Sequence, residues 1–205
     1  MSEWNSIDRK IAKIRYRTIK KYIPQSGVIA DIGCGQEAAF LKYCAPQIKK
    51  GYGFDFRIQN YKTGNLTLIN NRHSQGLELK SGCCDTVFML AVLEHLDNPE
   101  NLIQEANRIL KPGGTLVLTT PTIMAKPVLE CMAFQLHLIN VDEILEHKHY
   151  YVNQEIGALL KQCGFSKYKY QKFLFGMNSL AVAVKMRGGG NIVVIIRVPY
   201  QLQVG

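Results

Sequence analysis

Residues 28–35, VIADIGCG, decide the fold of this chain. The first five are apolar apart from Asp31, which predicts a short strand buried inside a sheet. Gly33 and Gly35 follow at once, and glycine lets the backbone adopt angles that side chains forbid and pass close to a ligand. A helical stretch begins near residue 37. A strand, a glycine turn and a helix in this order predict a nucleotide-type pocket at the carboxyl end of the first strand.

A second acid supports this pocket. Asp55 ends the expected strand 52–55, 20 positions after Gly35. An acid there is placed to accept hydrogen bonds from the two hydroxyls of a ribose. A dinucleotide-binding loop would carry a third glycine where this chain has Ala38, and a buried Asp31 just ahead of the loop would oppose a diphosphate. The same anion suits a ligand with a positive ammonium or sulfonium group.

The hydrophobic pattern extends this unit into an α/β protein. Strands that alternate with helices are typical of a doubly wound sheet. The last two strands have no clear helix between them, which predicts an antiparallel pair at one edge. We therefore expect a Rossmann-like doubly wound sheet, mostly parallel with an antiparallel edge strand, and helices on both faces. The expected strands are 28–32, 52–55, 65–70, 85–91, 115–120, 168–175 and 179–186, and the expected helices are 3–22, 37–43, 99–110 and 153–162.

One domain is expected over residues 1–186. Its first part, 1–23, predicts an amphipathic helix with Ile7, Ile11 and Ile14 on the apolar side and a basic outer face. Residues 121–146 predict a partly helical insertion. The tail 187–205 contains the β-prone run NIVVIIRV, and its role is unknown.

Composition excludes several classes of protein. Of the 205 residues, 47% are hydrophobic and 20% are charged, unlike disordered, collagen-like or disulfide-rich chains. The net charge of +9 permits an anionic partner such as nucleic acid without demanding one. The six cysteines lack a zinc-type spacing and predict reduced thiols in a cytoplasmic protein. No stretch reaches the ~18 apolar residues of a transmembrane helix, although the basic helix leaves peripheral membrane contact open.

Four segments in collinear order resemble the class I S-adenosylmethionine-dependent methyltransferases, in the small-molecule branch called type 11. DIGCG (31–35) resembles their first motif and GFD (53–55) their ribose-binding second motif. Residues 84–121 are similar to their fourth strand, the helix after it and their fifth strand, and 146–165 to the segment after their insertion. Several pieces in the right order are more specific than any one of them. The resemblance covers roughly residues 20–186 and implies S-adenosylmethionine as cofactor, with the N-terminal helix and 121–146 on the acceptor side.

The resemblance also implies the cofactor-binding residues. Asp31 would contact the methionine amino group and Asp55 the ribose hydroxyls. Phe54 or Phe56 could pack on the adenine. The remaining positions are the loop residues Gly33, Cys34 and Gly35, the pocket floor of Leu90 and Ala91, and Glu94 close to the methyl group.

Two positions depart from the family pattern. Glu37 stands where the first motif usually has a third glycine, and it could narrow the pocket or point to solvent. His73 stands where the family often has an Asp for the adenine amino group, and the nearby Asn71 could substitute. Neither change removes the ammonium and ribose contacts, so cofactor binding is still expected.

The candidates for catalysis are two histidines. His95, next to Glu94, is either a general base or a cap for its turn, and His147 is the second candidate for acceptor contact. No metal is expected, because Glu146, His147 and His149 lack a further ligand nearby. The sequence predicts methyl transfer to a small-molecule or a sugar-, lipid- or quinone-linked acceptor. An RNA methyltransferase and a non-catalytic binding protein of the same fold remain alternatives.

Overall fold

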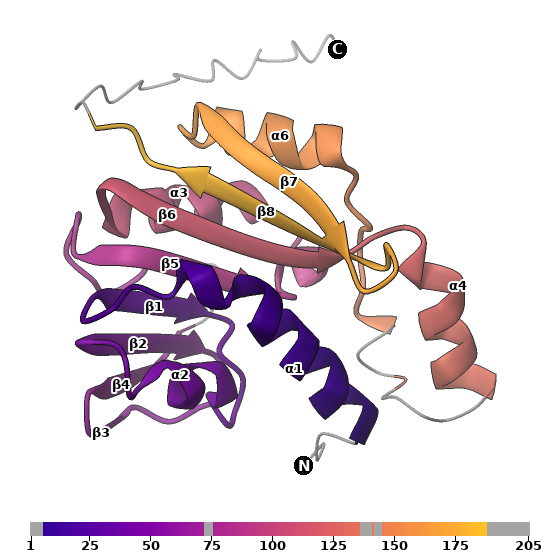
Figure 1. Cartoon of the computed structure of the whole chain (residues 1–205), viewed down its shortest axis with the longest axis horizontal. Helices are drawn as coiled ribbons and strands as arrows, with labels where there is room; N and C mark the ends of the chain where they lie inside the picture. The colour runs from indigo at the N-terminus through magenta and orange to yellow at the C-terminus, as the bar shows by residue number, and fades with distance from the viewer. Residues whose placement is uncertain (1–5, 72–75, 136–140, 142–144, 188–205) are drawn as a thin grey trace, which may run out of the picture.

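The computed structural model describes residues 6–71, 76–135, 141 and 145–187. One eight-stranded sheet with the order β3-β4-β2-β1-β5-β6-β8-β7 forms its centre (Figure 1). The strands are β1 (Val28–Ile32), β2 (Lys50–Asp55), β3 (Tyr61–Thr63), β4 (Leu66–Asn70), β5 (Cys84–Leu90), β6 (Leu110–Pro121), β7 (Lys167–Phe173) and β8 (Asn178–Val184). The helices are α1 (Ser6–Ile19), α2 (Ala39–Cys44), α3 (Pro99–Ile109), α4 (Ala125–Glu130) and α6 (Asn153–Gln162), with single turns η1 (Lys20–Tyr22), η2 (Leu93–His95) and η3 (Cys131–Gln135).

The sheet is mostly parallel, as predicted. Strands β4, β2, β1, β5 and β6 pair in parallel, while β8 and β7 add an antiparallel pair at one edge. β3 pairs antiparallel with β4 at the other edge. The sequence did not predict β3, because its three residues are all exposed and show no alternation.

The direction in which the strands are added reverses at β1. The chain passes from β1 outward to β2 and β4 and then returns to place β5 on the other side of β1. Open α/β sheets bind ligands at such a reversal, beyond the carboxyl ends of the strands. Here Asp31 lies beside Gly53 of β2 and Phe88 of β5, so the loops after these three strands meet at one edge of the sheet.

Helices cover both faces, which also confirms the prediction. α3 and α6 contribute Leu102, Ile103 and Leu160 to the hydrophobic core on one face. α1 and α2 contribute Ile19 and Leu41 to the core on the other face, in front of the sheet in Figure 1. Within the described residues, no helix has the length and apolarity needed to cross a membrane.

Some boundaries differ from expectation. α2 begins at Ala39, later than predicted, because Ala38 has a left-handed backbone with φ 45°. The buried side of α1 carries Ala12 and Ile19, whereas Ile14 is 37% exposed. The insertion forms α4 and η3, and Figure 1 shows α4 beyond the carboxyl ends of the strands. Its residues 136–140 and 142–144, and the tail run 191–198, lie outside the described residues.

Candidate active site

The turn after β1 is shaped by two glycines. Gly33 has φ 75° and Gly35 has φ 70°, both in the left-handed region that favours glycine. The N–H groups of Gly33 and Cys34 donate to the Phe54 carbonyl at 2.7 and 3.1 Å, which ties the turn to β2. A Cβ at Gly33 would lie 2.4 Å from Cγ2 of Val92, while a Cβ at Gly35 would meet no heavy atom of the described residues within 4 Å. The turn is therefore packed at Gly33 and open to a ligand at Gly35.

Asp31 is a buried carboxylate in β1. It is 2% exposed, and its Oδ1 has no hydrogen-bond partner among the described residues. Burial, together with the nearby Asp55, raises the pKa of Asp31 well above its ordinary value. An unpaired buried charge is costly, and a cationic group placed against it would remove that cost. Asp31 can thus hold an ammonium group of a ligand.

The pKa of Asp55 is shifted in the opposite direction to that of Asp31, although Asp55 too is only 2% exposed. Burial by itself would raise its pKa. Hydrogen bonds from the Arg57 side chain and backbone, the Arg57 charge and the Gly35 N–H outweigh that effect and lower it below the ordinary value. Asp55 is therefore ionised at neutral pH and can accept hydrogen bonds from ligand hydroxyls.

Arg15 is a site residue that sequence reasoning missed. α1 holds it so that its Nε is buried without a hydrogen-bond partner among the described residues. Burial lowers its pKa, while the Glu94 carboxyl and Tyr16 raise it. On a basic helix Arg15 looks like one more surface charge. The signal was its place one turn from both Ile11 and Ile19, on the side of the helix that faces the core.

Glu94, His95 and His147 come together just beyond the end of β5. Their carboxylate and imidazole ligand atoms all lie within 4.8 Å of one another. The rings of His95 and His147 have centroids 4.9 Å apart and planes inclined by 67°. The N–H of Lys148 donates to the Glu94 carbonyl at 2.8 Å and so fastens the segment after the insertion to η2. The structure thus brings together the two histidines that the sequence singled out.

Burial sets the protonation of this cluster. Glu94 is 1% exposed, and burial raises its pKa to about 7, although its own backbone N–H, Arg15 and Thr120 act against that rise. The Thr120 hydroxyl donates to Oε2 of Glu94 at 3.0 Å. Burial and the neighbouring His95 lower the pKa of His147 to about 4, and Nδ1 of His147 lies 3.1 Å from the Tyr150 hydroxyl. At neutral pH a neutral imidazole therefore lies beside a carboxyl close to half ionisation, a pair that can accept a proton.

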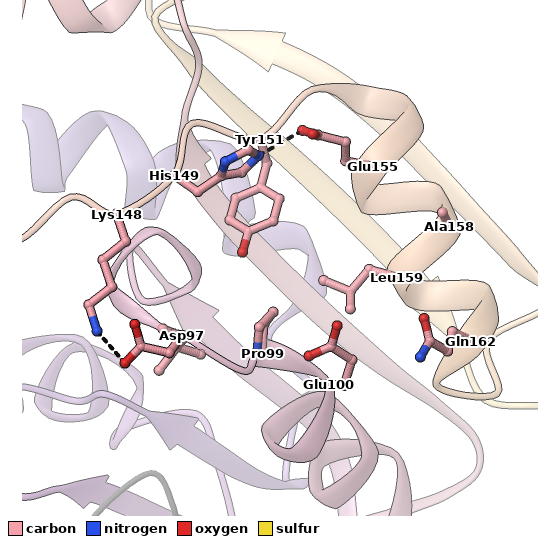
Figure 2. A pocket seen from close by; sticks show the side chains of 11 residues that line it. Asp97, Pro99, Glu100, Lys148, His149, Tyr151, Glu155, Ala158, Leu159 and Gln162 are labelled. Atoms are coloured by element: carbon pink, nitrogen blue, oxygen red, sulfur yellow. Dashed lines mark hydrogen bonds and ion pairs between the residues drawn. The ribbon is translucent and has the colours of Figure 1, made fainter. Parts of the chain in front are cut away.

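His149 belongs to a different place. It lines an open groove of about 510 Å³ between the start of α3 and α6, where its Nε2 lies 3.1 Å from Oε2 of Glu155 (Figure 2). Lys148 pairs with Asp97 elsewhere in this groove. None of the predicted cofactor or catalytic residues lines it. His147 therefore lies with Glu94 and His95, whereas His149 lies in the separate groove.

Burial decides which of the remaining aromatic and loop residues can contact a ligand through their side chains. Phe54 is 1% exposed and packs in the core, which leaves Phe56 as the candidate of the two for contact with an adenine. Phe56 is 51% exposed, with the Arg57 guanidinium carbon 5.3 Å from its ring centroid. The thiol of Cys34 is buried, so this residue can contribute to a pocket through its backbone. The Glu37 side chain is 79% exposed and pairs with Lys42 at 3.7 Å, so it does not narrow the pocket.

Leu90 and Ala91, the residues expected at the pocket floor, lie at the end of β5, and Asn71, expected near the adenine, lies just after β4. Leu90 ends β5, and Ala91 follows with a strained φ of 56° at the edge of the site. Asn71 is 5% exposed; its Nδ2 donates to the Gly76 carbonyl at 3.2 Å, and its Oδ1 has no partner among the described residues. His73 lies outside the described residues.

The sheet order and the glycine turn define a class I methyltransferase fold. Solved structures share it. The S-adenosylmethionine-dependent methyltransferase of Archaeoglobus fulgidus superposes with a TM-score of 0.66 at 17% identity, over 86% of this chain and 94% of that one. A chain from the complex between the Haloferax volcanii Trm112 methyltransferase activator and a methyltransferase superposes with a TM-score of 0.68 at 16% identity. The match covers 91% of this chain and 96% of that one. At these identities the likeness is one of fold.

Sequence comparison gives the family. The protein-family model described as "Methyltransferase domain" matches residues 4–170. A tRNA U34 carboxymethyltransferase of Desulfotalea psychrophila is 31% identical over 136 residues, 60% of this chain and 40% of that protein. A ubiquinone biosynthesis O-methyltransferase of Maricaulis maris is 29% identical over 129 residues, 57% and 47%. The match thus spans less than half the length of these relatives. The chain belongs to the methyltransferase-domain family, with S-adenosylmethionine as its cofactor.

The residues at the site fit this cofactor. Each of three buried polar atoms without a partner among the described residues has a complementary group on it. Oδ1 of Asp31 suits the methionine ammonium, Nε of Arg15 the methionine carboxylate, and Oδ1 of Asn71 the adenine amino group. Asp55 is the carboxylate that the ribose hydroxyls would meet.

Proposed function

We propose that the protein transfers a methyl group from S-adenosylmethionine to an oxygen of a small-molecule acceptor, free or linked to a sugar, lipid or quinone. The cluster of Glu94, His95 and His147 carries this proposal. An unactivated hydroxyl needs a base at the moment of methyl transfer, whereas many other acceptors need only positioning. A cluster of the buried Glu94 carboxyl and two half-buried imidazoles beside the end of β5 would supply such a base.

In this mechanism the bound cofactor supplies an electrophilic methyl group on a sulfonium. Asp31, Arg15, Asn71 and Asp55 would hold its ends. The pKa of His147, about 4, means that its imidazole is neutral at neutral pH, the form in which a ring nitrogen can take the acceptor's hydroxyl proton. Glu94 lies alongside, held by the Thr120 hydroxyl, and in its ionised form it would stabilise the imidazolium that forms.

The first experiment is calorimetric titration of the protein with S-adenosylmethionine and S-adenosylhomocysteine. Micromolar binding that is lost in Asp31→Ala and Asp55→Ala supports the cofactor site. Absence of binding by the wild type contradicts the proposal and favours a non-catalytic binding protein.

A screen of phenolic, quinol and sugar acceptors then tests the base. His147→Gln should keep S-adenosylhomocysteine affinity and lower kcat by about 10²- to 10⁴-fold. His149→Gln is the matched control, because that imidazole pairs with Glu155 in the separate groove. Equal activity of both variants would remove His147 from the mechanism.

An RNA acceptor is the second candidate. The exposed side of α1 carries Arg9, Lys10, Lys13 and Arg17. Three tRNA U34 carboxymethyltransferases, 28% to 31% identical, are among the relatives. If tRNA is the acceptor, its affinity should fall steeply with salt and drop when these side chains are replaced by alanine. Binding that does not depend on them would leave the small-molecule acceptor as the function.

A further inference from the structure

The carboxylate of Asp55 accepts four hydrogen bonds from its own chain. Oδ1 accepts from the Arg57 N–H at 2.9 Å and from Nε of Arg57 at 3.1 Å. Oδ2 accepts from the Gly35 N–H at 2.9 Å and from Nη2 of Arg57 at 3.3 Å. A carboxylate offers about four lone-pair positions, two on each oxygen. Asp55 therefore has none left for the two hydroxyls of a ribose.

The four donors differ in how easily they can leave. The two N–H groups belong to the backbone beside a buried carboxylate, so the path of the chain fixes them. The two guanidinium contacts are the longer ones, and they come from a side chain that is 46% exposed. Arg57 also lies over the ring of Phe56, which is itself half exposed. The guanidinium is thus the part of this arrangement that can move into solvent.

We propose that the Arg57 side chain occupies the ribose subsite in the free protein and is exchanged for the two ribose hydroxyls when the cofactor binds. The two guanidinium donors that leave are equal in number to the two ribose hydroxyls that replace them, one on each oxygen of Asp55. Residue 57 then sets the affinity for the nucleoside without being a catalytic residue. This inference rests on the proposed cofactor site.

The exchange makes an unusual prediction for a residue at the edge of a binding site. Removing Arg57 should strengthen binding, because the ligand no longer competes with an ion pair. S-adenosylhomocysteine is the suitable probe, since it lacks the sulfonium charge that would respond to any nearby cation. The Arg57→Ala variant keeps the backbone N–H of residue 57, so its hydrogen bond to Asp55 remains. The affinity of the Arg57→Ala variant for S-adenosylhomocysteine should rise by roughly fivefold, which is the scale of a half-exposed ion pair.

Two variants separate the exchange from a general electrostatic effect. Arg57→Lys keeps the charge but cannot contact both carboxylate oxygens at once. Its affinity for S-adenosylhomocysteine should therefore be intermediate between those of the wild type and Arg57→Ala. Lys42→Ala removes a cation of α2 that pairs with Glu37 rather than Asp55, and its affinity should stay at the wild-type value. The difference between wild type and Arg57→Ala should also shrink as salt rises from about 0.05 to 0.5 M, because salt screens the ion pair.

A direct readout follows the side chain itself. Phenylglyoxal modifies accessible guanidinium groups, and peptide mass spectrometry reports the rate at each arginine. S-adenosylhomocysteine should accelerate modification of Arg57, which exchange releases into solvent. Arg108, which is 34% exposed in its side chain and paired with Glu105 at 2.7 Å, is the internal control.

Each outcome decides between the two proposals. Weaker or unchanged binding by Arg57→Ala, or protection of Arg57 from phenylglyoxal, overturns the exchange and makes Arg57 a holder of Asp55 or of the ligand. Failure of both proteins to bind S-adenosylhomocysteine overturns the cofactor site, and the exchange with it.

Discussion

The two halves of the site are built in different ways. Asp31 and Asp55 lie on neighbouring parallel strands, where Asp31 is paired with Gly53, and a glycine turn joins them. The cluster of Glu94, His95 and His147, together with Thr120 beside it, comes from three distant segments. The pairing of β5 with β6 and the Lys148–Glu94 hydrogen bond join them. The first half depends on strand register and local backbone angles, whereas the second depends on tertiary packing. A cofactor pocket can therefore be encoded locally, while an acceptor site requires the whole fold.

The two halves touch where the Gly33 turn packs on Val92, and the largest expected effect breaks that contact. Gly33→Ala places a Cβ 2.4 Å from Val92 and forces alanine to φ 75°, which should cost about 4 kcal/mol of unfolding free energy. Gly35→Ala shares the backbone angle but meets open space, and should cost about 1 kcal/mol. Urea denaturation measures both. Equal losses would show that backbone angle, not packing between the halves, controls this turn.

Glu94 tests the acceptor half alone. Its folded pKa of about 7 lies above the ordinary 4.5, so the folded state holds its proton more tightly than the unfolded state. Its contribution to stability is complete below about pH 4.5 and is lost as the pH rises through 7, a change of about 3 kcal/mol. Glu94→Gln should remove this loss from the difference in unfolding free energy between pH 5 and 8. Glu37→Gln, at an exposed position, should keep the wild-type difference; a drop of the same size there would point to a non-local effect.

Asp31 tests whether the cofactor half trades stability for binding. Asp31→Asn removes a buried charge, so unfolding free energy at pH 8 should rise. S-adenosylhomocysteine affinity should fall about 30-fold, because the amide carries no charge to pair with the ligand ammonium. Calorimetry on the same preparation as the denaturation gives both values. A parallel fall in stability and affinity would mean that Asp31 is a structural group.

Glu37 should give the smallest effect. Its side chain is 79% exposed and pairs with Lys42 on the surface. Glu37→Ala should therefore change cofactor affinity less than about twofold and stability by at most about 0.5 kcal/mol. A large fall in affinity, measured by the same titration, would place this carboxylate inside the cofactor half.

Sequence reasoning reached the first half of the site further than the second. Asp31, the glycine turn and Asp55 are readable because each sits at a strand end with a fixed register. Arg15 and Arg57 were missed because their burial and their partners depend on side-chain packing, which no periodicity records. His95 and His147 were named separately, but only the fold shows them in contact. The strand and helix order followed from apolar patterning, while β3 and the left-handed Ala38 did not, since three exposed residues and one strained angle leave no pattern.

The strands at the two edges of the sheet limit its growth. β7 presents Lys167, Lys169 and Lys172 to solvent, and β3 presents Lys62. A second sheet that paired with either edge would have to crowd its own chain against these ammonium groups. The apolar parallel strands that hold the site thus lie between two charged margins, which protect a β-rich chain of this size from association edge to edge.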